Sequence, residues 1–191
     1  GIAVGMATNL VPHNLGEVIA AARHLLEHPA ADVHELMAFV PGPDYPGGGE
    51  IIGLDGVRDA YTTGRGSFRL RATTTVENVT PRRRGIVVTS LPAGVGPERV
   101  IERIKDLVQS KKLTGISDVV DLTDGESGLR LIIELKSGIA PEPMLEQLFR
   151  MTPLEDSITI NAVALVDGQP QTLGLRDMLE QFVTHRCEVV R

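Results

Sequence analysis

The sequence contains no tryptophan, and its aromatic residues account for only 3% of 191 positions. Aliphatic side chains must therefore build the core, from an apolar content of 42% that is ordinary for a globular protein. A single cysteine, Cys187, excludes an internal disulfide and favours a reducing, cytoplasmic setting. No apolar run is long enough to cross a bilayer, and the first residues lack the basic segment of a signal peptide. We therefore expect a cytoplasmic protein without a membrane partner.

The chain also lacks an excess of positive charge. Its 25 acidic and 19 basic residues give a formal net charge of −6, whereas a dedicated nucleic-acid-binding domain usually has a basic balance or a basic stripe. The arginines are grouped locally instead: Arg65, Arg69 and Arg71 form one group, and positions 82–84 form another. Composition alone therefore leaves the function undecided.

Helical signals recur along the chain. Asn14 can cap a first helix and Asp32 a short second one, because a glutamate follows each of them three residues later. Gly115 suits the position after the end of a longer helix that starts at Pro97. Further helices are expected at 56–62, from Pro141, and from Leu175 to the end of the chain.

From Ser67 the apolar period becomes two, which is typical of a half-buried strand that follows a tight turn at 64–66. Its inward face would carry Phe68, Leu70, Ala72, Thr74 and Val76. A turn at 80–84 returns the chain through 86–89 and predicts a hairpin. Two more strands are expected at 128–136 and 158–166, with a turn at Asp167-Gly168 after the second. The mixture predicts an α+β fold, with a mixed or antiparallel sheet and flanking helices.

Several segments occur in an order that is itself informative. They are GIAVGMATN and PHNLGEV, then PGPDYPGGG and DAYTTGRGSFRLRA, then ERVIERIKDLVQSKKLTGISDVVD, LRLIIELKSG and NAVALVDGQPQTLGLRDMLEQFVTHRCEVV. Over essentially the whole chain they resemble the A subunits of bacterial type IIA DNA topoisomerases, gyrase and topoisomerase IV. The resemblance implies an internal piece of a longer protein. Residues 1–40 would be the edge of a winged-helix region with connecting helices, 41–173 the tower domain, and 174–191 the start of a coiled-coil helix.

The reaction of that family is ATP-driven passage of one duplex through a transient double-strand break in another. A tyrosine attacks a backbone phosphate and holds the broken end covalently. The resemblance places this tyrosine upstream of Gly1, so we expect the chain alone to be inactive. It implies three partners in an A₂B₂ assembly: double-stranded DNA, a second A subunit, and the B subunit. Mg²⁺ and ATP would be bound by the B subunit, and no cofactor or metal by this chain.

The resemblance also assigns roles to particular residues. Ile2 would wedge between base pairs and help to bend the cleaved duplex, at an unstacking cost of a few kcal/mol; the alternative is a buried strand residue. Arg65, Arg69 and Arg71 are candidates for phosphate contacts, because two of them share a strand face and Arg65 stands between glycines that allow close approach. The alternative for these arginines is a solvated sheet face.

For several other residues the sequence pattern does not favour a catalytic, metal-binding or DNA-binding role. Neither Tyr45 nor Tyr61 has a histidine or carboxylate spaced to activate it, so we expect packing roles, with Tyr61 structural or near DNA. His13 would make a local polar contact, the arginines at 82–84 a charged hairpin tip, and the acidic residues at 118–126 a solvated loop.

Two departures from the family pattern leave gyrase and topoisomerase IV both open. PAGVG at 92–96 stands where the family often has PYQVN, and TPLEDS at 152–157 is more acidic than the usual TQLQTSF. Two alternatives to a DNA-supporting role also remain. One is a structural and protein-interaction module with negligible DNA affinity, which the acidic total favours. The other is a stand-alone metabolic enzyme, for which no nucleophile–base pair or cofactor loop is visible.

Overall fold

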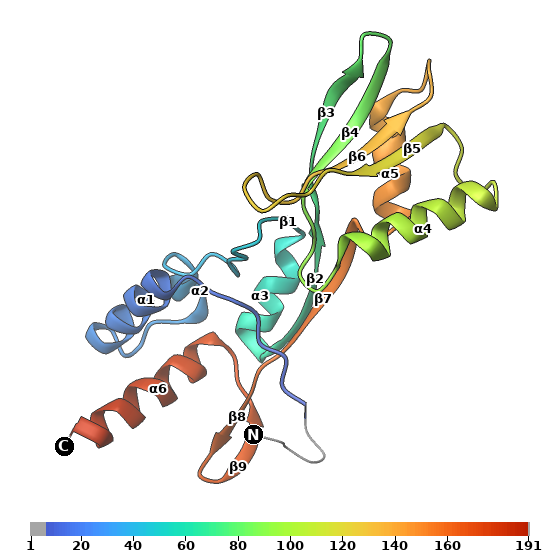
Figure 1. Cartoon of the computed structure of the whole chain (residues 1–191). Helices are drawn as coiled ribbons and strands as arrows, with labels where there is room; N and C mark the ends of the chain where they lie inside the picture. The colour runs from blue at the N-terminus through green and yellow to red at the C-terminus, as the bar shows by residue number, and fades with distance from the viewer. Residues whose placement is uncertain (1–6, 191) are drawn as a thin grey trace. The chain divides into compact units, whose positions relative to one another are not determined.

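The computed structural model of the chain describes residues 7–190 and divides them into two compact units (Figure 1). The first unit takes its described residues from 1–45, 53–68 and 157–191, and the second consists of 46–52 and 69–156. Strands β2 (Arg65–Arg71) and β7 (Glu155–Asn161) each contribute residues to both units. No helix within 7–190 is long and apolar enough to cross a membrane.

Four helices and one hairpin make up most of the first unit. They are α1 (Leu15–Glu27), α2 (Val33–Met37), α3 (Leu54–Thr63), α6 (Leu175–Val190), β8 (Val163–Val166) and β9 (Gln169–Thr172). The two predicted caps are confirmed: Oδ1 of Asn14 accepts from the Glu17 N–H at 3.1 Å, and Oδ1 of Asp32 accepts from the Glu35 N–H at 2.9 Å. Helix α6 contacts α1, α2 and α3, so it joins the helices of this unit.

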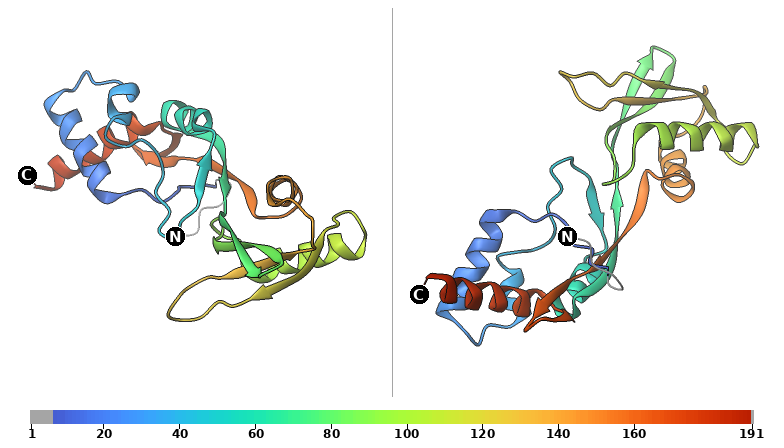
Figure 2. Two further views of the ribbon diagram at one scale, coloured as in Figure 1. Left: turned by 90° about the horizontal axis from the view of Figure 1, so that it is seen from above. Right: turned by 60° about the horizontal axis from the view of Figure 1, so that its bottom comes forward.

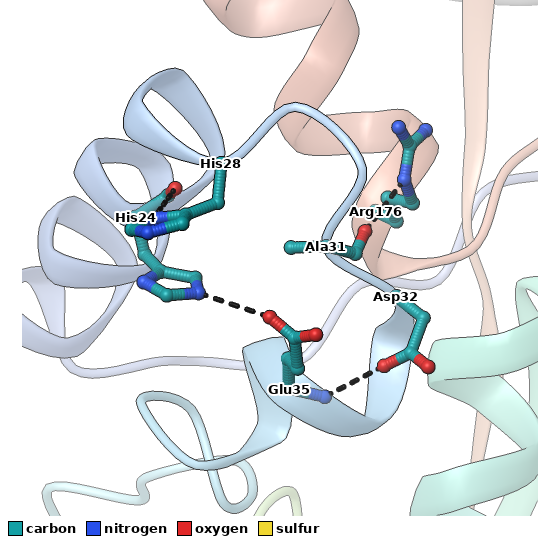
Figure 3. A network of polar contacts seen from close by, with 6 residues as sticks. All are labelled: His24, His28, Ala31, Asp32, Glu35 and Arg176. Carbon is teal, nitrogen blue, oxygen red and sulfur yellow. Dashed lines mark hydrogen bonds and ion pairs between the residues drawn. The ribbon is translucent and has the colours of Figure 1, made fainter.

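Polar contacts hold the α1–α2 connection against α6 (Figure 3). The Arg176 guanidinium on α6 donates from Nε to the Ala31 carbonyl at 2.9 Å and from Nη2 to the Pro29 carbonyl at 2.7 Å. On the other side, Nε2 of His24 lies 3.2 Å from Oε2 of Glu35, which links α1 to α2. The two contacts of Arg176 satisfy carbonyls that the proline-containing connection leaves without helical partners.

Helix α3 packs closely against the strand residues that follow it. A Cβ added at Gly56 would stand 1.7 Å from the Ser67 carbonyl oxygen, and one at Gly66 would stand 2.2 Å from the Gly56 carbonyl oxygen. Between them Gly64 ends α3 at φ 87°, a left-handed conformation that favours glycine. Glycine therefore permits the tight passage from α3 into β2.

The second unit is built on a four-stranded sheet with the order β3-β4-β6-β5. Its elements are β3 (Thr73–Thr80), β4 (Arg83–Ser90), α4 (Pro97–Gln109), β5 (Ile116–Asp121), β6 (Leu131–Leu135) and α5 (Pro141–Met151). Helices α4 and α5 lie against one face of this sheet (Figures 1 and 2). The core between them is aliphatic, as the composition requires: Ile86, Val88, Leu131, Ile133, Leu135, Val100, Ile104, Leu107, Met144 and Leu148.

A second sheet has the order β1-β2-β7, with β1 at Glu50–Ile52. Strand β1 pairs antiparallel with β2, so that Ile51 is opposite Leu70 and Glu50 is opposite Arg71. Along β2 the side chains alternate as predicted: Phe68 and Leu70 are buried, whereas Arg69 and Arg71 lie on the other face.

The α+β prediction is confirmed, because antiparallel sheets combine with helices and the last helix runs to Val190. The hairpins around 80–84 and at Asp167-Gly168 are also confirmed. Both residues of the second turn have positive φ, 52° and 76°, which is the geometry of a two-residue type I′ loop.

Four predictions about the strands and turns were wrong. The strand expected from Ser67 to Glu77 ends at Arg71 and resumes in the other sheet, because the Ala72 N–H donates to the Leu154 carbonyl at 2.7 Å. Val76, predicted to point inward, is 42% exposed on the edge strand β3.

The other two errors concern the first unit. The strand expected at 158–166 is interrupted at Ala162, whose N–H donates to the Gly64 carbonyl at 2.8 Å. The tight turn expected at 64–66 is a helix end at Gly64 followed by a strand that begins at Arg65.

We predict that Gly56→Ala destabilises the chain, because no backbone shift of a few tenths of an ångström removes a 1.7 Å contact with Ser67. The expected loss in the free energy of unfolding is about 3 kcal/mol, against the gain of up to about 1 kcal/mol that alanine usually brings within a helix. Urea denaturation followed by circular dichroism measures it. Gly47→Ala is the control, since nothing lies within 4 Å of its added Cβ; equal stability of the two variants would contradict the packing described.

Candidate functional site

One carboxylate and two guanidiniums meet where β2 and β7 belong to the second unit. The Glu155 side chain is 9% exposed and accepts from both arginines. Nε of Arg69 donates to its Oε1, while Nε and Nη2 of Arg71 lie 2.8 and 2.7 Å from its Oε2. Charge-assisted bonds of this kind are shorter and stronger than neutral ones, so Glu155 fixes both guanidiniums on the same face of β2.

Phe149 of α5 holds Arg71 from a second side. The guanidinium carbon of Arg71 lies 4.3 Å from the centre of the Phe149 ring, within the range of a cation–π interaction. The Arg71 side chain is 34% exposed, whereas that of Arg69, which has no such ring, is 51% exposed. Arg71 is thus an anchored group, and Arg69 is the more accessible one.

The charge state of Glu155 follows from two opposing effects. Burial raises the pKa of this carboxyl, but hydrogen bonds from Arg71 and Arg69, with their positive charges, outweigh burial and hold the pKa below its ordinary value. Glu155 is therefore ionised at neutral pH. The three groups together carry one net positive charge.

The arginines retain unused donors. Each guanidinium has five N–H groups, and in the contacts just described Arg69 uses only Nε and Arg71 uses only Nε and Nη2. An open hollow beside them is lined by Arg69, Arg71, Leu145, Glu146, Phe149, Arg150 and Glu155. A planar oxyanion or a phosphate could bind there through the remaining terminal amino groups.

The other predicted site residues have separate positions. Arg65 is exposed at the start of β2, between two glycines, and belongs to the first unit. Ile2 lies outside the described residues. The structure therefore brings Arg69 and Arg71 together, and the partner that joins them, Glu155, was not among the residues predicted.

Tyr61 and His13 form a pair that the sequence pattern did not predict either. The Tyr61 hydroxyl lies 2.7 Å from Nε2 of His13, and Nδ1 of His13 lies 2.9 Å from the Val11 carbonyl. Because a carbonyl only accepts, Nδ1 is the donor to Val11, and in the neutral form of the ring Nε2 accepts from the Tyr61 hydroxyl. Burial, together with the charge of Glu17, raises the pKa of Tyr61, which is only 5% exposed. A phenolate is thus disfavoured.

Tyr45 is likewise a packing residue. Its ring lies 6.4 Å from that of Phe68, centre to centre, and burial raises the pKa of its hydroxyl. A nucleophile is usually activated by a lowered pKa or by an accessible base, and Tyr45 has neither in the described part of the chain.

The acidic residues predicted to form a loop at 118–126 begin within a strand, because Asp118 and Asp121 belong to β5, and only the residues after Asp121 lie in the loop. Two of the aspartates cap turns. Oδ1 of Asp121 accepts from the Thr123 N–H at 2.9 Å, and Oδ1 of Asp124 accepts from the N–H groups of Glu126 and Ser127. The Thr123 side chain, and then its backbone N–H, lower the pKa of Asp121. The Ser127 side chain, followed by the backbone N–H groups of Ser127 and Glu126, lowers the pKa of Asp124. Within 7–190, no three His, Cys, Asp or Glu side chains are grouped so as to hold a metal ion. The arginines at 82–84 are exposed around the β3–β4 turn.

Comparison with known proteins identifies the family of this chain. Residues 1–191 match the family of DNA gyrase/topoisomerase IV A subunits. The chain is 50% identical over 192 residues to the DNA gyrase A subunit of Pseudomonas aeruginosa and 45% identical over 190 residues to that of Brachyspira hyodysenteriae. It is 44% identical over 192 residues to the probable chloroplastic/mitochondrial DNA gyrase A subunit of Oryza sativa. Each match covers 100% of this chain but only 20–23% of the relative, so the chain spans about a fifth of their length.

We predict that Tyr61→Phe lowers the free energy of unfolding by about 1 kcal/mol, because it removes the hydrogen bond to His13 and leaves Nε2 without a partner. Tyr45→Phe is the matched control, since the buried Tyr45 hydroxyl has no partner within the described residues; its removal should be neutral or stabilising. Thermal unfolding of the two variants distinguishes them, and a larger loss for Tyr45→Phe would show that the hydrogen bond is misassigned.

We predict that Glu155→Gln lowers the free energy of unfolding at neutral pH by roughly 1–2 kcal/mol, a modest amount because solvent screens the half-exposed Arg69. The folded pKa of Glu155 is below its ordinary value of 4.5. Its stabilising effect is therefore complete above that value and is lost as the pH falls through the lower folded pKa. Denaturant titrations at several pH values should show the two proteins converging as the pH falls below 4.5 and through the lower folded pKa of Glu155. A difference that grew on acidification would contradict this assignment.

Proposed function

Because the chain belongs to the family of DNA gyrase and topoisomerase IV A subunits, we propose that it is the tower region of the DNA-breaking subunit of an ATP-dependent type II topoisomerase. The proposal is supported by a family match along the whole chain and by a pair of sheet arginines with unused donors. In this role the chain supports the arms of a bent, cleaved duplex, and Ile2 wedges between base pairs.

The covalent chemistry of the proposed reaction belongs to other parts of the assembly. A tyrosine outside this chain attacks the DNA phosphate, while the B subunit binds Mg²⁺ and ATP, and two A subunits act together with two B subunits. Tyr45 and Tyr61 are poor substitutes for that nucleophile, because burial raises the pKa of both hydroxyls. The chain alone is therefore inactive in this proposal, and the assembly works in the bacterial cytoplasm.

The arginines of β2 would act on the DNA backbone and not on the bases. Lysine and arginine contacts to phosphates are independent of sequence and release counterions, so their contribution to affinity falls as salt rises. Arg69 is the most suitable of the pair, since half of its side chain is exposed and only its Nε is engaged by Glu155. Arg65 would add a further contact from the exposed start of the same strand.

One observation favours a second candidate, a structural module that binds protein and not DNA. Helices α1 and α6 expose large apolar side chains along a shared groove, among them Leu15 at 71%, Leu26 at 56% and Phe182 at 60%. Exposed apolar surface of this kind marks protein contacts, and the net charge of −6 does not attract DNA.

We predict that replacing Arg65, Arg69 and Arg71 together by glutamine weakens binding of a fluorescent duplex of about 40 bp roughly ten-fold or more at low salt. The loss should be similar for unrelated DNA sequences, and the slope of log affinity against log salt should fall by about 1 for each contact removed. Anisotropy titrations of the 191-residue chain measure both quantities.

The matched control removes the same charge from the hairpin tip, by replacing the arginines at 82–84 with glutamine. Its effect on affinity should be smaller. If wild type fails to bind duplex at low salt, or if the two triple variants lose affinity equally, the arginines of β2 are not the DNA contact and the structural module becomes the better account.

A further inference from the structure

If Arg69 and Arg71 bind DNA, the Glu155 carboxylate competes with the DNA phosphate for the same guanidinium groups. The Glu155 carboxylate, whose side chain is 9% exposed, already occupies one edge of each guanidinium, as a phosphate oxygen would. The hollow beside them is lined by three guanidiniums, of Arg69, Arg71 and Arg150, and by two carboxylates, of Glu146 and Glu155. The excess of positive charge there is therefore small.

We propose that Glu155 is a built-in attenuator of DNA affinity: its carboxylate holds Arg69 and Arg71 in place and at the same time weakens their attraction for a phosphate. This inference rests on the proposed function, because it concerns the same arginines. The partner is the phosphate backbone of double-stranded DNA.

Glu155 weakens phosphate binding because a phosphate held by the two arginines would lie close to its carboxylate. The terminal amino groups that stay available belong to the same guanidiniums that touch Glu155, so a phosphate bound to them comes within several ångströms of the carboxylate. Two negative charges about 5 Å apart near a hydrated surface repel by an amount that corresponds to a several-fold loss in affinity. Glu155 does not readily move away from the arginines, because a carboxylate that is only 9% exposed is costly to leave without partners.

Hydrogen bonds allow Glu155 to hold the Arg69 and Arg71 side chains in position. Both Nε atoms donate to Glu155, and Phe149 covers the Arg71 guanidinium. These contacts restrict two side chains that otherwise have many rotamers, and they leave terminal donors for an incoming acceptor. Attenuation keeps such contacts weak enough to be made and broken, which suits a duplex that must be released after passage.

The test compares Glu155→Gln with wild type in anisotropy titrations of the 191-residue chain with labelled duplex, in a series of salt concentrations. Glutamine keeps an acceptor oxygen for the arginines but removes the charge. We expect roughly three- to ten-fold tighter binding at low salt and a steeper salt slope. Thermal unfolding followed by circular dichroism confirms that the variant is folded under the assay conditions.

Two further variants isolate the cause. Glu126→Gln removes the same charge from an exposed loop that has no contact with these arginines, and it should change affinity much less. In the background of Arg69→Gln and Arg71→Gln, the addition of Glu155→Gln should bring no gain, because the groups that it affects are gone. If Glu155 only stabilises the fold, the effect of Glu155→Gln on affinity should not depend on the presence of Arg69 and Arg71.

Each other outcome overturns the inference in a recognisable way. Unchanged or weaker binding by Glu155→Gln, while loss of the arginines still weakens binding, leaves the proposed function intact and shows that the carboxylate does not attenuate. An equal gain from Glu126→Gln reduces the effect to net charge. Binding that is insensitive to Arg69 and Arg71 rejects the proposed function and the attenuation together.

Discussion

The Glu155 carboxylate imposes a local constraint on which the candidate site depends, because a charge that is 9% exposed requires partners. It has them in Arg69 and Arg71, and the second of these is further held by the Phe149 ring. The alternation of β2 then places Phe68 and Leu70 in the interior and both guanidiniums on one open face. One ionised carboxyl thus determines where the positive charge of this strand is held, in a chain whose overall charge is negative.

Local signals in the sequence were sufficient for much of the fold. The caps at Asn14 and Asp32, the Asp167-Gly168 turn and the α+β class all depend on residues close together in the chain. The interruptions at Ala72 and Ala162 do not, because each is made by a backbone hydrogen bond to a distant segment. Period-two alternation continues across such a point, so it cannot reveal that the chain has entered another sheet.

The candidate site was also only partly predictable from the sequence. Alternation indicated that Arg69 and Arg71 share a face, but their partner is separated from Arg69 by 86 residues. The acidic segment at 152–157 was the only available signal for it. The Tyr61–His13 pair, 48 residues apart, was missed for the same reason. The roles of Ile2 and of the three arginines toward DNA stay predictions, since the family match establishes membership along the chain and not the contact made by each side chain.

The central claim, that the arginines of β2 meet the DNA backbone, is tested most directly by arginine-selective chemical labelling of the chain with and without duplex DNA, read by mass spectrometry. The account predicts that duplex protects Arg69 and Arg65, that salt reverses this protection, and that Arg71, already covered by Glu155 and Phe149, reacts slowly in both states. Protection confined to the arginines at 82–84, or to none, would contradict the account.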